Sequence, residues 1–389
     1  MKRRKLLVTA STFPRWSDDT EPRFVLDLCR NLTEEFDVTV LVPAAPNALD
    51  EEIIDGVHVV RYHYCPIHKW ETLCYPGAIV PRIKEKKRRI LLVPFLFLAL
   101  YYNLLKKLPE YDIVHAHWLI PQGIVQSFFK KPYIVTGHGG DVTSLNISIM
   151  KKAKARCIEK ASYVTVVSHF LEEKVQEIRK TDKIAVMPMG CDTSNFSSKY
   201  RVENLFGQGN DKVVLFVGRL AEKKGVKYLI RAMSNIDAKL VIVGKGPLEE
   251  ELKSEAKKCG GKVLFMGAKT HEELRAIYAS ADVFVAPSVT AGDGDREGFG
   301  LVMLEAMASG IPVVAFESGG ISEVIKHEKN GLLCKEKDVQ GLEQNILRIL
   351  NEPVLYNKLV SEGQKTVQEY DYREVASRYT DVYMKALQK

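Results

Sequence analysis

The chain has 389 residues, more than one hydrophobic core usually organises, so its length indicates two domains. With 46% hydrophobic and 27% charged residues, the composition excludes an intrinsically disordered protein. The formal net charge of +7 suits an anionic ligand or a membrane surface, but the basic residues are not interleaved with aromatic platforms. We therefore expect no nucleic-acid partner.

The seven cysteines give no sign of a metal centre or a disulfide framework. They are scattered and form no Cys-x-x-Cys pair, so we expect reduced thiols and a cytoplasmic protein. The N-terminal sequence MKRRKLLVTA is basic, but its apolar run of about six residues is shorter than the ~7 to 15 of a signal-peptide core. It is typical of a first strand.

Short apolar runs bounded by turns recur along the chain, mostly at helix-length intervals, and predict buried strands of parallel sheets. In the first half the expected strands are Leu6–Ala10, Val38–Val42, Val57–Tyr62, Ile113–Ala116, Tyr133–Thr136 and Tyr163–Val167. In the second half they are Lys212–Gly218, Leu240–Gly244, Val263–Gly267, Val283–Pro287, Val313–Phe316 and Gly331–Cys334. The predicted fold class is α/β, with two doubly wound, Rossmann-like domains whose strand ends face a shared cleft.

The domain boundary is expected in Met187–Gln208, a turn-rich segment without hydrophobic periodicity. This places a first domain at residues 1–190 and a second at 191–370. The C-terminal segment 371–389 is predicted to be a helix that packs back on the first domain.

One segment departs from the alternating pattern. The basic run Arg82–Arg89 leads into Ile90–Leu105, which is apolar on all sides for 16 residues. A membrane-spanning helix needs roughly 20 apolar residues, and Pro94 and Asn103 interrupt this one. Two interpretations remain: a helix buried in the first domain, or contact of residues 82–105 with a membrane surface. The second is favoured and predicts a peripheral protein on the inner face of the cell membrane.

The most informative stretch is APSVTAGDGDREGFGLVMLEAMASGIPVVA, residues 286–315. It predicts a strand, a glycine-rich loop and a helix that begins near Gly298 or Phe299. Free N–H groups at a helix start bind anions, and Gly298 and Gly300 lack side chains that would keep a diphosphate away. About two helical turns, roughly 9 to 12 Å, separate Glu297 from Glu305, so the two carboxylates reach different parts of one elongated ligand. A helix-capping glutamate and a surface glutamate are the alternative, which the surrounding sequence disfavours.

In this setting Glu297-x7-Glu305 resembles the glutamate motif of retaining GT-B glycosyltransferases, most closely the group-4 family. The resemblance implies that Glu297 contacts donor-sugar hydroxyls and that Glu305 accepts hydrogen bonds from the ribose. FVGRLAEKKG also matches the family, whose arginine and lysine at these places hold the diphosphate; here they are Arg219 and Lys224. Arginine can make paired hydrogen bonds to phosphate oxygens. Two solvated surface cations are the alternative.

The turn VIVGKGPL follows a further strand, and its glycines allow close approach of a flat ring. In the resembled family this loop and the next strand end flank the nucleobase. The donor-binding residues implied are Arg219, Lys224, Gly246, Ala268, Gly298, Phe299, Gly300, Leu301 and Glu305.

In the first domain, PYIVTGHGGDV places His138 just past an expected strand, where the family has a functional histidine. The resemblance thus implies that His138 and Glu297 are catalytic, and titration near neutral pH would make the histidine adaptable. Packing of a glycine-rich turn by His138, and helix capping by Asp141, are the alternatives. His115 and His117 share one face of a strand without an apparent third ligand, which favours packing or acceptor-site lining over a metal pair.

After the first strand the sequence departs from the family. Many members have a glycine-rich turn there, whereas this chain has STFPRWSDDTEPRF, residues 11–24. Candidates for contact with the acceptor are Arg15, Trp16 and Arg23 in this loop, together with Asp141. The alternative is that Pro14 and Pro22 only shape the loop.

The resemblance covers essentially the whole chain. It implies transfer of a hexose-type sugar from a nucleotide-diphosphate sugar, with retention, to a lipid-linked acceptor or a precursor of a polysaccharide or cell-envelope glycan. Since Arg219, Lys224 and the helix-start amides would stabilise the departing diphosphate, no cofactor and no divalent metal are expected. Asp293-Gly294-Asp295 has the pattern of a metal motif but lies in the loop typical of this metal-free group. A sugar-nucleotide epimerase or phosphorylase of the same fold, or a non-catalytic nucleotide-sugar-binding protein, are the alternatives.

Overall fold

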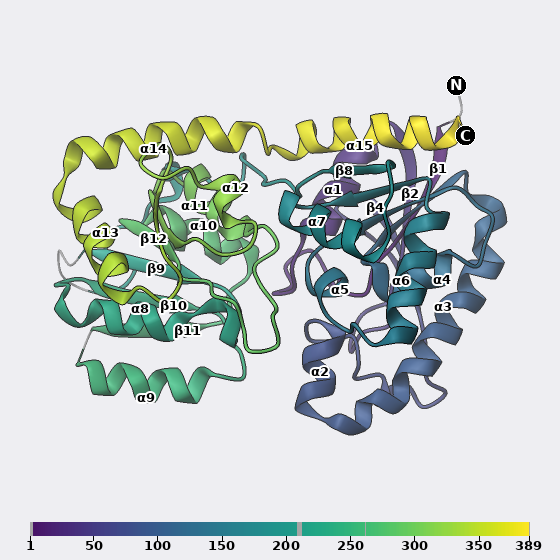
Figure 1. Cartoon of the computed structure of the whole chain (residues 1–389), viewed down its shortest axis with the longest axis horizontal. Coiled ribbons are helices and arrows are strands. Elements are labelled where there is room, and N and C mark those ends of the chain that lie inside the picture. The colour runs from purple at the N-terminus through teal and green to yellow at the C-terminus, as the bar shows by residue number, and fades with distance from the viewer. Residues whose placement is uncertain (1–2, 208–211, 261, 389) are drawn as a thin grey trace. The chain divides into compact units, whose positions relative to one another are not determined.

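The computed structural model describes residues 3–207, 212–260 and 262–388; Gln208 and Lys389, which end two of the predicted segments, lie outside these ranges. The chain divides into two compact units (Figure 1). Unit 1 comprises Met1–Met189 and Tyr372–Lys389, and unit 2 comprises Gly190–Asp371. Each unit is a sheet of mainly parallel strands covered by helices, which confirms the prediction of two doubly wound α/β domains.

Unit 1 contains a sheet of order β3-β4-β2-β1-β5-β6-β7-β8. Its strands are β1 (Arg4–Thr9), β2 (Phe36–Pro43), β3 (Glu51–Ile54), β4 (Val57–Tyr62), β5 (Ile113–His117), β6 (Tyr133–Gly137), β7 (Tyr163–Val166) and β8 (Ile184–Val186). All pairs are parallel except β3 with β4, which form a hairpin around Asp55-Gly56. Strands β3 and β8 were not predicted, although Asp-Gly is a strong signal for a two-residue hairpin turn.

The helices of unit 1 are α1 (Phe24–Leu32), α2 (Ile79–Glu85), α3 (Val93–Lys107), α4 (Ile124–Gln126), α5 (Gly140–Thr143), α6 (Ser148–Lys160), α7 (His169–Ile178) and α15 (Tyr372–Leu387). The C-terminal helix α15 packs against α1 and β6. It buries Tyr379 and Tyr383 completely, and the hydroxyl of Tyr383 lies 2.7 Å from Nδ1 of His115. The last helix therefore belongs to the core of unit 1.

Helix α3 is apolar all round, but only one of its faces is buried. Helix α3 packs against α4 and β4 of unit 1, and its buried residues are Leu96, Leu100 and Leu104. The opposite face is exposed, so the interpretation of Ile90–Leu105 as a fully buried helix is wrong. Length and composition alone would let Lys87–Glu110 cross a membrane, and 17% of its most apolar stretch is buried.

Unit 2 contains a parallel sheet of order β11-β10-β9-β12-β13-β14. Its strands are β9 (Val213–Val217), β10 (Lys239–Val243), β11 (Val263–Gly267), β12 (Val283–Ala286), β13 (Val313–Phe316) and β14 (Leu332–Cys334). Its helices are α8 (Val226–Ala232), α9 (Glu249–Cys259), α10 (His271–Ala279), α11 (Leu301–Ala308), α12 (Ile321–Val324), α13 (Val339–Asn351) and α14 (Pro353–Gln368). All the strands predicted in this half are present. Buried parallel strands are continuous apolar runs in the sequence, and of these strands only β11, at the edge of the sheet, is mostly not buried.

Both sheets have a point at which the strand order reverses. Strand β9 lies between β10 and β12 in unit 2, and β1 lies between β2 and β5 in unit 1. Open parallel sheets bind ligands beyond the carboxyl ends of the strands at such switch points. The loops after β9 and β12, and those after β1 and β5, are therefore the places to look for a site.

Candidate active site

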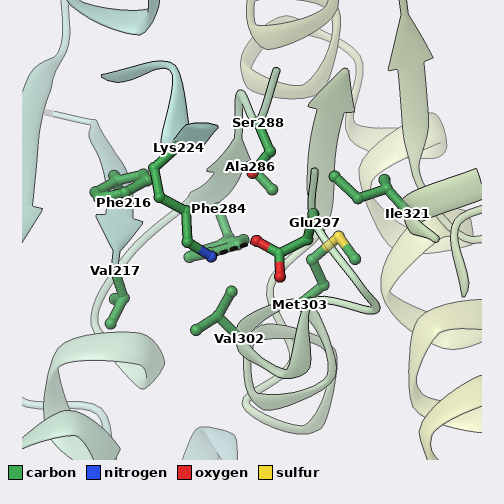
Figure 2. A pocket seen from close by; sticks show the side chains of 11 residues that line it. Phe216, Val217, Lys224, Phe284, Ala286, Ser288, Glu297, Val302, Met303 and Ile321 are labelled. Atoms are coloured by element: carbon green, nitrogen blue, oxygen red, sulfur yellow. Dashed lines mark hydrogen bonds and ion pairs between the residues drawn. The ribbon is translucent and has the colours of Figure 1, made fainter. Parts of the chain in front are cut away.

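A pocket in unit 2 opens at the carboxyl ends of β9 and β12 (Figure 2). Phe216, Val217, Phe284 and Ala286 of the two strands form its apolar floor. Its polar lining comes from the segments that follow the strands, and includes Lys224, Ser288 and Glu297. Predicted donor residues from two distant parts of the chain thus meet at the switch point of this sheet.

Lys224 and Glu297 form an ion pair across the switch point. The ammonium group of Lys224, at the end of the short 3₁₀ helix η6 (Glu222–Lys224), donates a hydrogen bond to Oε2 of Glu297, and Figure 2 shows the two side chains pointing at one another. Burial alone would raise the pKa of Glu297, but the charges of Lys224 and Lys223 outweigh it and hold this pKa at about 2. Glu297 is therefore a carboxylate at every physiological pH.

The backbone of Glu297 is held from behind by the turn before α12. The N–H of Gly320 donates to the carbonyl oxygen of Glu297 at 3.0 Å. Gly319 has a φ of +56°, and a Cβ atom there would lie 2.1 Å from the same oxygen. Only glycine fits this place, so GG in the sequence FESGGI is a positioning signal that sequence reasoning missed.

Helix α11 begins at Leu301, two or three residues later than the start predicted near Gly298 or Phe299. Gly300 caps the helix with a φ of +91°, a left-handed conformation that ends the loop abruptly. The helix-start amides thus belong to residues 301–303, and Glu305 lies about one turn into the helix instead of two. Phe299 is buried with its ring 5.5 Å from that of Tyr370, so its side chain serves the core.

Glu305 accepts a hydrogen bond of 2.7 Å from the hydroxyl of Tyr278, at the end of α10. Burial and the nearby carboxylate of Glu305 raise the pKa of Tyr278, so its hydroxyl stays protonated and can only donate to Glu305 in this pair. The sequence analysis did not identify Tyr278, because a tyrosine in an amphipathic helix gives no sign of its partner.

Arg219, Gly246 and Ala268 lie just beyond the carboxyl ends of β9, β10 and β11, three neighbouring strands. Arg219 is half-buried and Ala268 is exposed. At Gly246 an added Cβ would lie 2.3 Å from the carbonyl oxygen of Leu220, so this glycine lets two loops of the protein pack together. Contact of these residues with a donor remains a prediction.

The switch point of unit 1 is lined by rings. His138 follows β6, and its Nε2 lies 2.9 Å from Nδ1 of His117, at the end of β5. The rings of Phe24 and Trp118 lie 5.1 and 4.9 Å from that of His138. Burial lowers the pKa of His138 to about 3, so the expectation that it titrates near neutral pH is wrong. The ring is therefore neutral, and it shares a hydrogen bond with His117.

Asp141 joins the two turns that follow β5 and β6. Its carboxylate accepts hydrogen bonds from the backbone N–H groups of Leu119 (2.8 Å), His138 (3.1 Å) and Gly139 (2.9 Å). These three contacts give Asp141 a structural role, because they fix the conformation of both turns. Contact of Asp141 with an acceptor stays a prediction. The neighbouring His115 is fully buried between Thr136 and Tyr383, which fits the packing interpretation.

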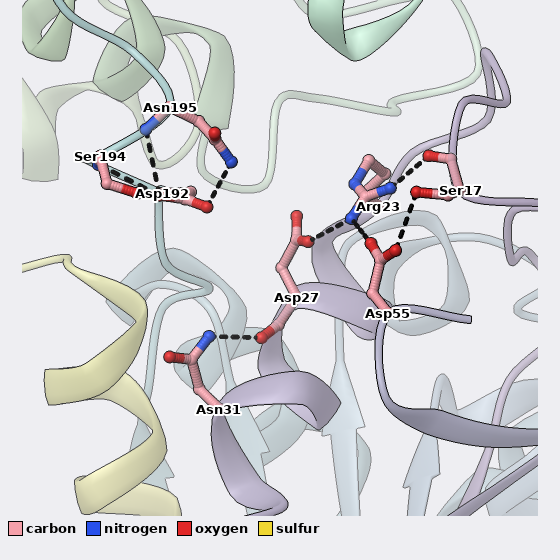
Figure 3. A network of polar contacts seen from close by, with 8 residues as sticks. All are labelled: Ser17, Arg23, Asp27, Asn31, Asp55, Asp192, Ser194 and Asn195. Atoms are coloured by element: carbon pink, nitrogen blue, oxygen red, sulfur yellow. Dashed lines mark hydrogen bonds and ion pairs between the residues drawn. The ribbon is translucent and has the colours of Figure 1, made fainter. Parts of the chain in front are cut away.

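Arginines hold the loop after β1. Arg15 makes a two-point contact with Asp19, both bonds at 2.9 Å, and lies between the rings of Trp16 and Tyr75. Figure 3 shows a second network, in which Arg23 binds Asp27, Asp55 and the carbonyl oxygen of Ser17. Ion pairs thus fix the conformation of this loop. Trp16 is 38% exposed and is more accessible than Arg15 and Arg23, the other candidate acceptor contacts in this loop.

Comparison with known proteins agrees with this arrangement. The profile of the Glycosyl transferases group 1 matches residues 201–366, and that of Glycosyltransferase Family 4 matches residues 22–195. An uncharacterized glycosyltransferase of Methanocaldococcus jannaschii, MJ1607, is 33% identical over 304 residues, which cover 72% of this chain and 76% of that protein. The chain belongs to glycosyltransferase family 4. This glycosyltransferase is also similar to the GDP-mannose-dependent alpha-(1-6)-phosphatidylinositol monomannoside mannosyltransferase of Mycobacterium tuberculosis, with 32% identity over 56% of this chain and 60% of that one.

Solved structures establish the fold of this glycosyltransferase. Sucrose-phosphate synthase from Thermosynechococcus elongatus matches it with a TM-score of 0.81 and 23% identity, over 99% of this chain and 100% of that one. Anabaena HepE, solved in complex with UDP and glucose, matches with a TM-score of 0.75 and 19% identity, over 98% and 100%. The family and the GT-B fold implied by the sequence resemblance are thereby confirmed, and the enzyme is a transferase.

Proposed function

We propose that this glycosyltransferase moves a hexose-type sugar from a nucleotide-diphosphate sugar to a hydroxyl acceptor, with retention at the anomeric carbon. The observation that carries the proposal is the Lys224–Glu297 pair at the switch point of unit 2. Without donor the two charges neutralise one another. A bound diphosphate can form an ion pair with Lys224 in place of Glu297. The carboxylate of Glu297 is then available to accept hydrogen bonds from sugar hydroxyls.

The charges in the pocket suit a departing diphosphate. Arg219 and Lys224, together with the start of α11, would stabilise the negative charge that develops as the sugar leaves. Glu305, fixed by Tyr278, is assigned to the ribose hydroxyls. In unit 1 the neutral ring of His138 would donate a hydrogen bond to an oxygen of sugar or phosphate.

We propose further that the transfer needs no divalent metal. Asp295, the second acid of Asp293-Gly294-Asp295, lies with Oδ2 3.0 Å from Nζ of Lys223. Burial opposes the charge of Lys223, but the charges of Glu297 and Asp295 outweigh it and raise the pKa of Lys223, so the carboxylate of Asp295 already has a cation. The measurement is the transfer rate with Mg²⁺ added or omitted, and a rate that requires Mg²⁺ contradicts the proposal.

The nucleotide is the first thing to measure, because the base-flanking residues Gly246 and Ala268 offer few side-chain atoms for reading it. One similar protein uses GDP-mannose and one was solved with UDP. A calorimetric screen of UDP-, GDP- and ADP-sugars identifies the donor. Magnetic-resonance analysis of the product then reports the anomeric configuration, and an inverted product would refute the proposed stereochemistry.

We also propose that unit 1 docks on a membrane, where a lipid-linked acceptor would be reached. On α3 an exposed apolar face is formed by Phe95, Leu98, Tyr102 and Leu105, spaced by three or four residues. Leu98 is 67% exposed, and Leu91, just before the helix, is 70% exposed. Lys86, Lys87 and Arg88 lie exposed directly before this face, in the arrangement typical of helices that lie in an anionic membrane interface.

Arg89 does not belong to this basic group. Its guanidinium is buried and donates to Thr72, to the carbonyl oxygen of Arg82 and to Glu85. The predicted membrane contact through 82–105 is therefore narrowed to the exposed residues, and Arg89 is left unchanged in the test.

Flotation with vesicles that contain phosphatidylglycerol tests the contact. Reversal of Lys86, Lys87 and Arg88 to Glu, or the double change Phe95→Ser and Leu98→Ser, should remove the protein from the vesicle fraction. The matched control reverses Lys227, Lys257 and Lys258 of unit 2. Equal flotation of all variants contradicts the membrane proposal and leaves the transferase proposal intact.

A further inference from the structure

Two histidines and a glutamate gather in the loop that follows β4 in unit 1. Potential ligand atoms of His63, His68 and Glu71 all lie within 4.8 Å of one another. The rings of His63 and His68 stack with centroids 3.5 Å apart and an angle of 7° between their planes. Glu71 is buried, His63 half-buried and His68 exposed. The proposed transferase function uses none of these side chains.

Neighbouring groups fix His63 and Glu71 by hydrogen bonds of the kind that orient metal ligands. Oε1 of Glu71 accepts hydrogen bonds from the backbone N–H groups of Tyr64 (2.5 Å) and Cys65 (2.9 Å). Oε2 of Glu71 lies 2.7 Å from Nδ1 of His63, whose Nε2 lies 3.1 Å from Oδ1 of Asp50. A metal-binding histidine usually donates its second ring N–H to a carboxylate, and ligating carboxylates are themselves hydrogen-bonded. Both supporting contacts are present here.

We propose that His63, His68 and Glu71 bind one zinc-like divalent cation, with water completing its coordination. The ion replaces the proton between Nδ1 of His63 and Oε2 of Glu71, and that proton is released to solvent. Asp50 continues to accept from Nε2 of His63. Imidazole nitrogens favour Zn²⁺ and its neighbours over Mg²⁺ or Ca²⁺, which prefer sites made of oxygen atoms.

The geometry requires a small movement of one side chain. Ligands of a tetrahedral Zn²⁺ at about 2.0–2.2 Å lie about 3.4 Å from one another, closer than the 4.8 Å limit of this cluster. Stacked rings direct their nitrogen lone pairs along parallel planes, so one ring must tilt to share an ion. His68 is exposed and sits on the short 3₁₀ helix η1 (His68–Trp70), and it can tilt without disturbing the core. The ion would then tie η1 to the end of β4.

Zinc binding is measured on the tag-free full-length chain, freed of metal with a chelator and titrated with zinc chloride alone in a calorimeter. We expect one ion per chain and a melting temperature that rises with zinc concentration. His68→Asn and, separately, Glu71→Gln should weaken binding by about 10- to 100-fold or more. Because His68 is exposed, its variant should fold normally even where Glu71→Gln does not. The matched control is His169→Asn, which changes an exposed histidine 2.9 Å from Glu172.

The outcomes are clear-cut. Zinc bound to wild type and to the His169 variant, but weakly to the His68 variant, supports the site. A wild-type chain that binds no zinc overturns it, as does equal affinity in wild type and the His68 variant. The result is independent of sugar transfer, which is measured separately with donor and acceptor.

Discussion

The two units share the strand order on either side of their switch points but place opposite kinds of chemistry there. In unit 2 the pocket holds an ion pair, and Lys223 and Lys224 keep the pKa of Glu297 at about 2. In unit 1 the corresponding place holds His115, which is fully buried, and His138, which is half-buried, and desolvation lowers the pKa of each to about 3. A charged pocket suits a diphosphate, whereas neutral rings suit the hydroxyl groups of a sugar or an alcohol. The scaffold thus fixes where a ligand binds, and the residues after each strand decide which ligand.

The largest effect is expected at Glu297. Glu297→Gln removes the charge but keeps the shape, so kcat should fall about 10²- to 10³-fold, as it does when one transition-state contact is lost. Donor affinity should stay equal or improve, because Lys224 is released for the diphosphate. Steady-state kinetics and calorimetry separate the two quantities. Glu272→Gln, an exposed glutamate on α10, serves as the control. An unchanged kcat would remove Glu297 from the reaction.

Replacement of Lys224 tests whether the positive charge in the pocket of unit 2 binds the donor. Lys224→Ala should weaken nucleotide-sugar affinity about 10- to 100-fold, because a charge-assisted contact worth ~1.5–3 kcal/mol is lost. The partly buried carboxylate of Glu297 is also left without its cation and repels the diphosphate. Calorimetry with the donor found in the screen gives the dissociation constant, and Lys227→Ala on α8 is the control. Wild-type affinity in the Lys224 variant would refute the diphosphate assignment.

Acid should destabilise unit 1 before unit 2. The folded-state pKa values of His115 and His138, about 3, lie below the ordinary value of 6.5, so only the unfolded chain takes up these protons between these pH values. Stability is therefore present above pH 6.5 and falls as pH drops toward 3, by about 1.4 kcal/mol per pH unit for each histidine. The lowered pKa of Glu297 reduces the free energy of unfolding of unit 2 only below about pH 4.5, the ordinary pKa of a glutamate.

Calorimetric unfolding from pH 7.5 to 5 checks this order. His115→Gln, which keeps a group able to bond Tyr383 or Thr136, should show a smaller decrease in melting temperature over this range than wild type. His169→Gln changes an exposed histidine and should follow the wild-type curve. Identical slopes for all three proteins would show that His115 is not protonated on unfolding in this range.

Much of the fold could be predicted because buried parallel strands are continuous apolar runs; β9 and β13 needed no tertiary information. Lys224 and Glu297 were each predicted from the resemblance, but their pairing depends on β9 and β12 being neighbours, although 73 residues separate the two side chains. Chain geometry decided other details. The left-handed conformation of Gly300 delays α11 to Leu301, and Gly246 is a glycine because Leu220 approaches it.

The burial of individual polar side chains was the property that could be predicted least well from the sequence. Arg89 ends a run of basic residues that read alike, yet it is buried because Thr72 and Glu85 lie beside it in the fold. For the same reason His138 was expected to titrate near neutral pH, whereas desolvation lowers its pKa and keeps the half-buried ring neutral. Periodicity reports which face of an element is apolar, but not which polar residue another segment covers.

The smallest expected effect concerns Tyr278, an uncharged side chain that donates a hydrogen bond to Glu305. Tyr278→Phe removes one hydroxyl and leaves the ring packed against Phe196 and Phe284. A hydrogen bond to a charged group contributes ~1.5 kcal/mol or less where a ribose hydroxyl can replace it, so donor affinity should fall about three- to tenfold with kcat unchanged. Tyr228→Phe on α8 is the control, measured with the same calorimetric titration. A loss as large as that of Lys224→Ala would mean that orientation of Glu305, and not charge alone, governs donor binding in unit 2.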